Sequence, residues 1–252
     1  MDSPFFVIAL GAALGGFVQG LSGFAFGMTA MSVWAWTLEP ALAAALSVFG
    51  SLTGQVIAAV TVRRGFDLRR LWPFLAGGVA GIPLGLWLLA RVDQTLFRCL
   101  LGGLLVVWCP AMLFAARLPR IPDTGRVADG AVGVLGGAMG ALGGFTGTIP
   151  TLWCTLRGLP KDAQRSIVQN FNLAMLAVTF VVYLGRGLAT VQMLPQFGIV
   201  AAAMAVPVLM GGRLYTGLSD LAFRRIVLGL LTCSGIALLV ASLPVLLARA
   251  GG

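Results

Sequence analysis

The hydrophobic pattern of this 252-residue chain consists of long apolar runs without charged residues, separated by short charged segments. A helix needs about 20 mostly apolar residues to cross the hydrocarbon core of a bilayer. Six runs reach or approach that length, and the shortest of them has 18 residues. They predict six membrane-crossing helices, over residues 41–62, 71–90, 99–116, 162–185, 190–212 and 222–248.

Two further apolar segments do not fit a simple crossing. Residues 3–38 carry no charge, and as one straight helix they would extend about 54 Å, far beyond the core of ~30 Å. The second segment is also over-long, and the glycine-rich stretches Gly20–Gly27 and Gly140–Thr148 interrupt the two. In lipid, a backbone that leaves the helix must find internal hydrogen-bond partners. We therefore predict two re-entrant hairpins, over 3–38 and 127–157, whose arms are each too short to span comfortably.

The distribution of basic residues supports this interpretation. If both broken segments crossed the membrane, the 17 Lys and Arg residues would divide nine to eight. If both are re-entrant, thirteen lie on one side and only Arg91, Arg98, Arg186 and Arg249 on the other. Cytoplasmic loops are enriched in Lys and Arg. The second arrangement is therefore favoured, with both termini periplasmic, and eight crossings are the alternative.

The two halves of the chain resemble each other. Residues 15–24 and 136–145 share a glycine pattern at a constant offset of 121. Prolines recur in step with it, because Pro40, Pro73 and Pro83 correspond to Pro160, Pro195 and Pro207. We predict a first repeat over 1–116, a linker over 117–126 and a second repeat over 127–252.

Three crossings per repeat place the second copy upside down relative to the first. The predicted fold is therefore an all-α polytopic membrane protein of two inverted repeats. Each repeat is a re-entrant, glycine-broken helical hairpin followed by three transmembrane helices.

Composition narrows the classes of function. Only 10% of the residues are charged, whereas a soluble domain has about 25%. The net charge is +9, but the basic residues form no contiguous block, so we expect a lipid bilayer and no nucleic acid as partner. Histidine is absent, and the four cysteines form no Cys-x-x-Cys pair, so we expect no metal or other cofactor. The cysteines are Cys99, Cys109, Cys154 and Cys233.

The glycine breaks are the candidate binding site. Half-helices that begin at a break direct free N–H groups and a positive dipole end into the gap, which suits a small anion. Paired breaks in corresponding positions are also typical of transporter substrate sites. Close helix packing is the alternative role of such glycines. The candidate residues at the breaks are Ser22, Gly23, Phe24, Gly143, Gly144, Phe145, Thr146 and Thr148.

The helix after each break carries a polar stripe at helical spacing. In the first repeat the stripe is Ser47, Ser51 and Gln55, and in the second it is Arg165, Gln169 and Asn172. Such groups either join helices or line a pathway. We assign Gln55, Gln169 and Asn172 to the binding site. Arg165 either attracts the anion as a fixed charge with planar donors or extends to the membrane surface as an ordinary anchor.

The paired glycine motifs and the sequence Gly-Leu-Pro-Lys-Asp-Ala-Gln-Arg ending at Arg165 resemble the sulfite exporter TauE/SafE family of bacterial inner-membrane transporters. This resemblance covers nearly the whole chain. It implies export of sulfite or small organosulfonates and a location in the bacterial inner membrane.

Together these observations predict a secondary transporter, and not an enzyme, that exports a small oxyanion by alternating access. No ATP-binding motif is recognisable, so an ion gradient or the membrane potential would drive it. A gated anion channel, or a transporter of another small organic anion, is the alternative. The partners are a small anionic substrate and the bilayer, and a homo-oligomer is left open.

Overall fold

The computed structural model describes residues 4–61, 65–115, 119–122, 125–214 and 220–250. Within them the chain forms α-helices, one short 3₁₀ helix (Val191–Met193) and no strand, which confirms the all-α prediction. The first five helices are α1 (Pro4–Ser22), α2 (Phe26–Trp34), α3 (Pro40–Thr61), α4 (Leu68–Leu89) and α5 (Gln94–Phe114). The remaining five are α6 (Gly125–Gly143), α7 (Thr148–Leu156), α8 (Lys161–Gly185), α9 (Leu194–Leu214) and α10 (Asp220–Ala250).

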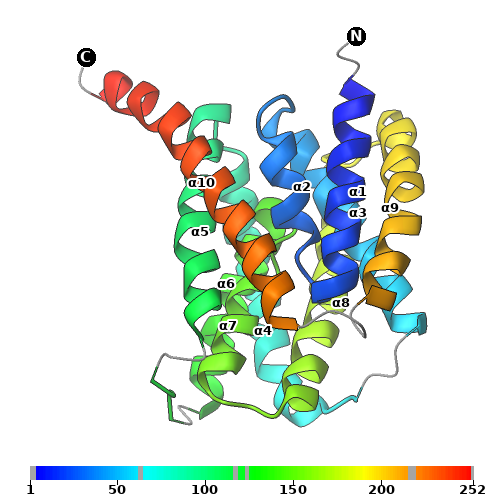
Figure 1. Cartoon of the computed structure of the whole chain (residues 1–252), viewed down its shortest axis with the longest axis vertical. Helices are drawn as coiled ribbons and strands as arrows, with labels where there is room; N and C mark the ends of the chain where they lie inside the picture. The colour runs from blue at the N-terminus through cyan, green and yellow to red at the C-terminus, as the bar shows by residue number, and fades with distance from the viewer. Residues whose placement is uncertain (1–3, 62–64, 116–118, 123–124, 215–219, 251–252) are drawn as a thin grey trace.

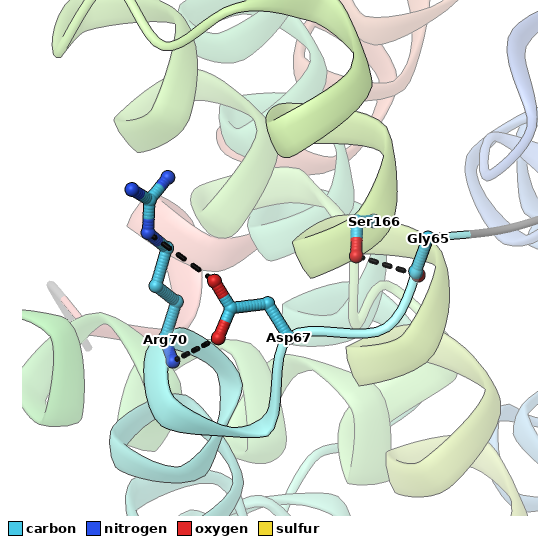
Figure 2. Close-up of polar contacts among 4 residues, drawn as sticks. All are labelled: Gly65, Asp67, Arg70 and Ser166. Atoms are coloured by element: carbon cyan, nitrogen blue, oxygen red, sulfur yellow. Dashed lines mark hydrogen bonds and ion pairs between the residues drawn. The ribbon is translucent and has the colours of Figure 1, made fainter.

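Several helices begin earlier than the charge-free runs indicate, because charged residues occupy their first turns. The carboxylate of Asp67 caps α4 by accepting the backbone N–H of Arg70 at 3.2 Å (Figure 2). The carboxylate of Asp93 caps α5 in the same way. Inside α5, the Arg98 guanidinium donates to the backbone carbonyls that follow α2. In these helices a charged residue therefore does not mark the boundary of the helix, as the charge-free runs had implied.

Among the described residues seven helices are long and apolar enough to cross a membrane, and the chain is a multi-pass membrane protein. Six of them correspond to the predicted crossings, and the seventh is α1. The glycine break divides each broken segment unequally, into arms of 19 and 9 residues. Of the four arms only α1 is among these seven helices, so the expectation that both arms are too short to span is wrong for the first segment. The seven segments are Pro4–Ser22, Pro40–Val60, Leu68–Leu89, Gln94–Phe114, Lys161–Gly185, Val191–Arg213 and Arg225–Arg249.

Each broken segment folds back on itself. In the first, the indole N–H of Trp34, at the end of α2, donates to the carbonyl of Val7 near the start of α1 at 3.1 Å. In the second, the indole N–H of Trp153 on α7 reaches the carboxylate of Asp129 on α6 at 2.8 Å, and Arg157 forms an ion pair with the same oxygen. The short arm therefore runs antiparallel to the long arm in both segments.

The reversal occurs at equivalent glycines. Gly23 and Gly144 have φ values of +83° and +77°, a backbone region that glycine enters at little cost. Their N–H groups donate to the carbonyls of Gln19 and Gly140, both at 2.7 Å, and so close the last turn of the long arm. These two bonds are separated by the same offset of 121 residues.

The helices of the two halves pack in matching pairs. The long arm α1 packs along α9, and the long arm α6 packs along α4. The helices α5 and α10 form a third pair, and α3 lies against α8 near the centre. Both chain ends lie at the same end of the molecule (Figure 1). The pairing of α1 with α9 thus repeats that of α6 with α4.

Glycines allow two of these pairs to approach closely. On α4, a Cβ at Gly77, Gly81 or Gly85 would overlap a backbone carbonyl oxygen of α6. On the other pair, a Cβ at Gly20 would overlap the Val208 carbonyl of α9. Small residues at helix crossings are the usual route to tight packing in membranes.

We expect Gly81→Ala to destabilise the protein by about 1–3 kcal/mol, the usual cost of overpacking a tight contact. The added methyl group would displace α6 at the Val134 carbonyl. Thermal unfolding of the purified protein in detergent measures this effect. Gly103→Ala is the matched control, since no heavy atom lies within 4 Å of a Cβ there. Equal melting temperatures for the two variants would contradict the close packing.

Candidate functional site

The two glycine breaks meet in the interior of the molecule. A Cβ at Gly27 would lie 3.0 Å from the carbonyl oxygen of Gly143, and one at Gly147 would lie 3.1 Å from Cβ of Phe24. The first break is therefore in direct contact with the second.

Side chains of α3 satisfy the backbone carbonyls of both breaks. The hydroxyl of Ser47 donates to the carbonyl of Gly143 at 2.7 Å, and the amide of Gln55 donates to the carbonyl of Gly23 at 2.6 Å. From α1, the amide of Gln19 donates to the carbonyl of Ser51 at 3.0 Å. The polar side chains of α3 thus join the helices. Gln55 holds the first break through the Gly23 carbonyl and is not part of the cavity lining described next.

One cavity of about 830 Å³ borders the first break and not the second. Its inner surface is the turn Gly20–Ala25, together with Trp108 of α5 and Gln169 of α8. The rings of Phe24 and Trp108 meet edge to face there, with centroids 5.8 Å apart. Thr151 and Thr155 of α7 also line the cavity. The cavity is therefore lined by helices from both halves of the chain.

The charged residues of the cavity are at the start of α8 and the end of α9. Lys161, Asp162 and Arg165 come from α8, and Arg213 from α9. Their charges sum to +2, from three basic residues and one acidic residue. The described residues offer Arg165 no hydrogen bond or ion pair, and its side chain is exposed. Both helix ends lie at the end of the molecule opposite the chain termini (Figure 1).

The start of α8 is anchored beside these charges. The Ser166 hydroxyl donates to the carbonyl of Gly65 at 2.6 Å, as Figure 2 shows, and the amide of Asn170 donates to the same oxygen at 3.0 Å. Gly65 precedes the capping residue Asp67 at the start of α4. The segment before α4 therefore fixes the position from which Arg165 extends.

The structure brings five of the twelve predicted site residues to the cavity: Ser22, Gly23, Phe24, Arg165 and Gln169. Gln55 lies behind Gly23, and the other six surround the second break, outside the cavity lining. Those six are Gly143, Gly144, Phe145, Thr146, Thr148 and Asn172.

Two predicted hydroxyl donors are engaged with the backbone. Ser22 donates to the carbonyl of Val18 at 2.8 Å and accepts the N–H of Ala25 at 3.2 Å. Thr148 donates to the carbonyl of Phe145 at 2.7 Å. These hydroxyls therefore stabilise the turns of the two breaks.

Other cavity residues were absent from the sequence-based set. Gln19 could have been found, since it is a polar residue one turn before the first break. Trp108 and Arg213 could not, because no local pattern distinguishes them from interfacial anchors. The remaining polar residues that the sequence did not assign are Thr151, Thr155, Lys161, Asp162 and Gln164.

Polar atoms are also buried beside the second break. A Cβ at Gly144 would lie 3.2 Å from the hydroxyl oxygen of Ser51, and one at Gly147 would lie 3.0 Å from the amide oxygen of Asn172. Each of these oxygens is buried without a hydrogen-bond partner among the described residues. A buried polar atom without a partner is costly, so this region differs from ordinary helix packing.

The fold and the cavity define a multi-pass membrane protein with an internal, positively charged pocket. The family model described as sulfite exporter TauE/SafE matches residues 7–238. The chain therefore belongs to the TauE/SafE family of membrane transporters. Searches of curated proteins and of solved structures gave no match.

We expect Gly144→Ala to cost more stability than Gly187→Ala. Both glycines have positive φ, so each substitution carries about 1–2 kcal/mol of backbone strain. At Gly144 the new methyl group would also press on the backbone oxygen and hydroxyl of Ser47, whereas the space at Gly187 is open. Thermal unfolding of both variants in detergent compares the two costs. An equal loss would mean that the break tolerates a side chain.

Proposed function

We propose that this protein is a secondary transporter that exports a small oxyanion, sulfite or a small organosulfonate, from the cytoplasm by alternating access. The observation that carries the proposal is the cavity of about 830 Å³, which has an excess of basic residues and ends at a glycine break. Membership of the TauE/SafE family supports the choice of anion.

The proposed orientation places the cavity end in the cytoplasm of a bacterium and both termini in the periplasm. Figure 1 draws the cavity-side helix ends opposite the termini. Of the described basic residues, nine belong to the cavity end and four to the other. The nine are Arg69, Arg70, Arg120, Arg126, Arg157, Lys161, Arg165, Arg213 and Arg225, and the four are Arg91, Arg98, Arg186 and Arg249. This imbalance is what the positive-inside rule expects of an inner-membrane protein.

The same orientation makes both broken segments re-entrant and the two repeats inverted. The α1–α2 hairpin would enter from the periplasm and return to it, and the α6–α7 hairpin would do the same from the cytoplasm. The matching helix pairs and the equivalent glycine turns support this arrangement. Three full crossings, α3 to α5, then lie between the two hairpins, and three more, α8 to α10, follow the second.

The anion would bind where the cavity reaches the first break. The amide nitrogen of Gln169 lies near this turn, 3.3 Å from the position of a Cβ at Gly23. The helix α2 begins just beyond with no side-chain cap, so its first N–H groups and positive dipole end lie close by. Arg165 would supply a full positive charge nearer the mouth.

Release to the other side would require the second break to become accessible. In the present conformation Trp34, Ala43 and Ala44 are fully buried on that side, and the two breaks close the path by direct contact. In the alternate conformation the hydroxyl of Ser51 and the amide NH2 of Asn172 would donate hydrogen bonds to the anion. This closure favours a carrier over an open channel. An anion leaving a negative cytoplasm gains about 2.3 kcal/mol per charge per 100 mV.

Sulfite flux into proteoliposomes, driven by an imposed membrane potential, tests the proposal. We expect saturable flux with purified protein and none with empty liposomes. A sulfite flux that does not saturate with sulfite concentration would support a gated channel. The absence of any sulfite flux would refute the proposed function.

We expect Gln169→Leu to lower kcat/KM for sulfite roughly 10- to 100-fold, the effect of losing one hydrogen bond to a charged group. The substitution keeps the approximate volume and removes the amide donor beside Gly23. Gln192→Leu, on the 3₁₀ helix away from the cavity, is the control and should leave the flux unchanged. Wild-type kinetics in the Gln169 variant would remove this residue from the site.

A further inference from the structure

The charges of the cavity mouth have no counterparts in the other repeat. At the offset of 121 residues, Arg165 corresponds to Ala44, and when the repeats are aligned on Pro40 and Pro160 it corresponds to Ala45. Both alignments therefore replace the arginine by alanine.

The other three charged residues follow the same rule. Lys161 corresponds to Pro40 or Ala41 in the two alignments, and Asp162 to Ala41 or Leu42. Arg213 corresponds to Leu89 when Pro83 is matched with Pro207. No position equivalent to a mouth charge is charged in the first repeat.

The remaining charges at the opposite end do not replace them. Arg98 is engaged by the carbonyls of Ala35 and Trp36, both at 2.8 Å. Arg249 forms an ion pair with Asp93, whose pKa is lowered chiefly by the backbone N–H of Leu96 and then by this arginine. Glu39, directly before α3, is acidic and exposed. Arg91 lies over the ring of Trp87, and Arg186 caps the C-terminal end of α8.

We propose that the transporter captures its anion electrostatically from the cavity side only, through Lys161 and Arg165, and opens to an uncharged vestibule on the other side. This inference rests on the proposed function and adds an asymmetry that the repeated backbone does not have. Charged clefts raise the local concentration of an oppositely charged substrate. The cavity side therefore has the lower KM.

The asymmetry is kinetic. A carrier without an energy source cannot change the final distribution of the anion, so the charges alter the KM on one face and the rates of the loaded carrier. They leave the equilibrium set by the anion gradient and the membrane potential unchanged. Salt screens the attraction between the mouth charges and the anion, because the Debye length shrinks from about 10 Å at 0.1 M salt to about 3 Å at 1 M. The salt dependence of KM therefore identifies electrostatic capture. High salt raises KM on the cavity side and leaves it unchanged on the other.

The test measures initial rates of sulfite uptake in membrane vesicles of opposite orientation. Inside-out vesicles present external sulfite to the cavity side, and right-side-out vesicles present it to the other face. The double variant K161Q/R165Q should raise KM about tenfold in inside-out vesicles and leave KM unchanged in right-side-out vesicles. Asp162→Asn, which adds one net positive charge to the mouth, should lower KM on the cavity side.

The control variant R69Q/R126Q removes two exposed charges from the same end of the molecule but outside the cavity. It should leave both KM values unchanged, which separates the cavity charges from general surface charge. Equal KM changes on the two faces, a control effect as large as that of K161Q/R165Q, or a rise of KM in Asp162→Asn would overturn one-sided capture. Absence of sulfite flux in the wild type would instead refute the proposed function, and this inference with it.

Discussion

The structure depends on pairing the backbone polar groups where two helices break inside an apolar interior. Lipid offers these groups no partners, so protein must supply them. The carbonyl of Gly143 accepts the hydroxyl of Ser47, and the carbonyl of Gly23 accepts the amide of Gln55. Both donors belong to α3. A helix that reads as an ordinary apolar span thus holds the two breaks together, one from each half of the chain.

Glycine has two separate roles around this centre. At Gly23 and Gly144 a positive φ reverses the chain, and the same bond closes the turn at both places. At Gly81 on α4 the backbone is helical, and the missing side chain leaves room for the Val134 carbonyl of α6. The first role creates the breaks, and the second holds the long arms of the hairpins against their partner helices. The glycine content therefore serves both the site and the packing that positions it.

The sequence was sufficient for the all-α class, the membrane segments and the two break positions, because apolar length and glycine clusters are local signals. It did not reveal that α1 is long and apolar enough to span, because the glycine cluster marks the break only roughly and the turn itself is set by one glycine, Gly23. The location of the cavity could not be predicted from the sequence either. It depends on residues such as Trp108 of α5 and Arg213 of α9, which only the packing of distant helices brings together. The local bond from the Thr148 hydroxyl to the carbonyl of Phe145 was also not anticipated, because the sequence does not show whether a hydroxyl beside a break turns to the backbone or to a ligand.

The two halves of the chain pack their helices in matching pairs but differ in their charges, and this difference has a physical origin. The start of α8 is exposed at the cavity mouth, where Arg165 remains solvated. The equivalent part of α3 is fully buried at Ala44 and Ala45, where an unpaired arginine would incur a large desolvation cost. If the closed side opens during transport, those alanines must pack tightly in one conformation and line a path in the other, which only small uncharged residues can do. Lys161 and Arg165 face no such conflict, because both are exposed at the start of α8. Charge can therefore be placed on one vestibule of an otherwise repeated structure without destabilising its closed state.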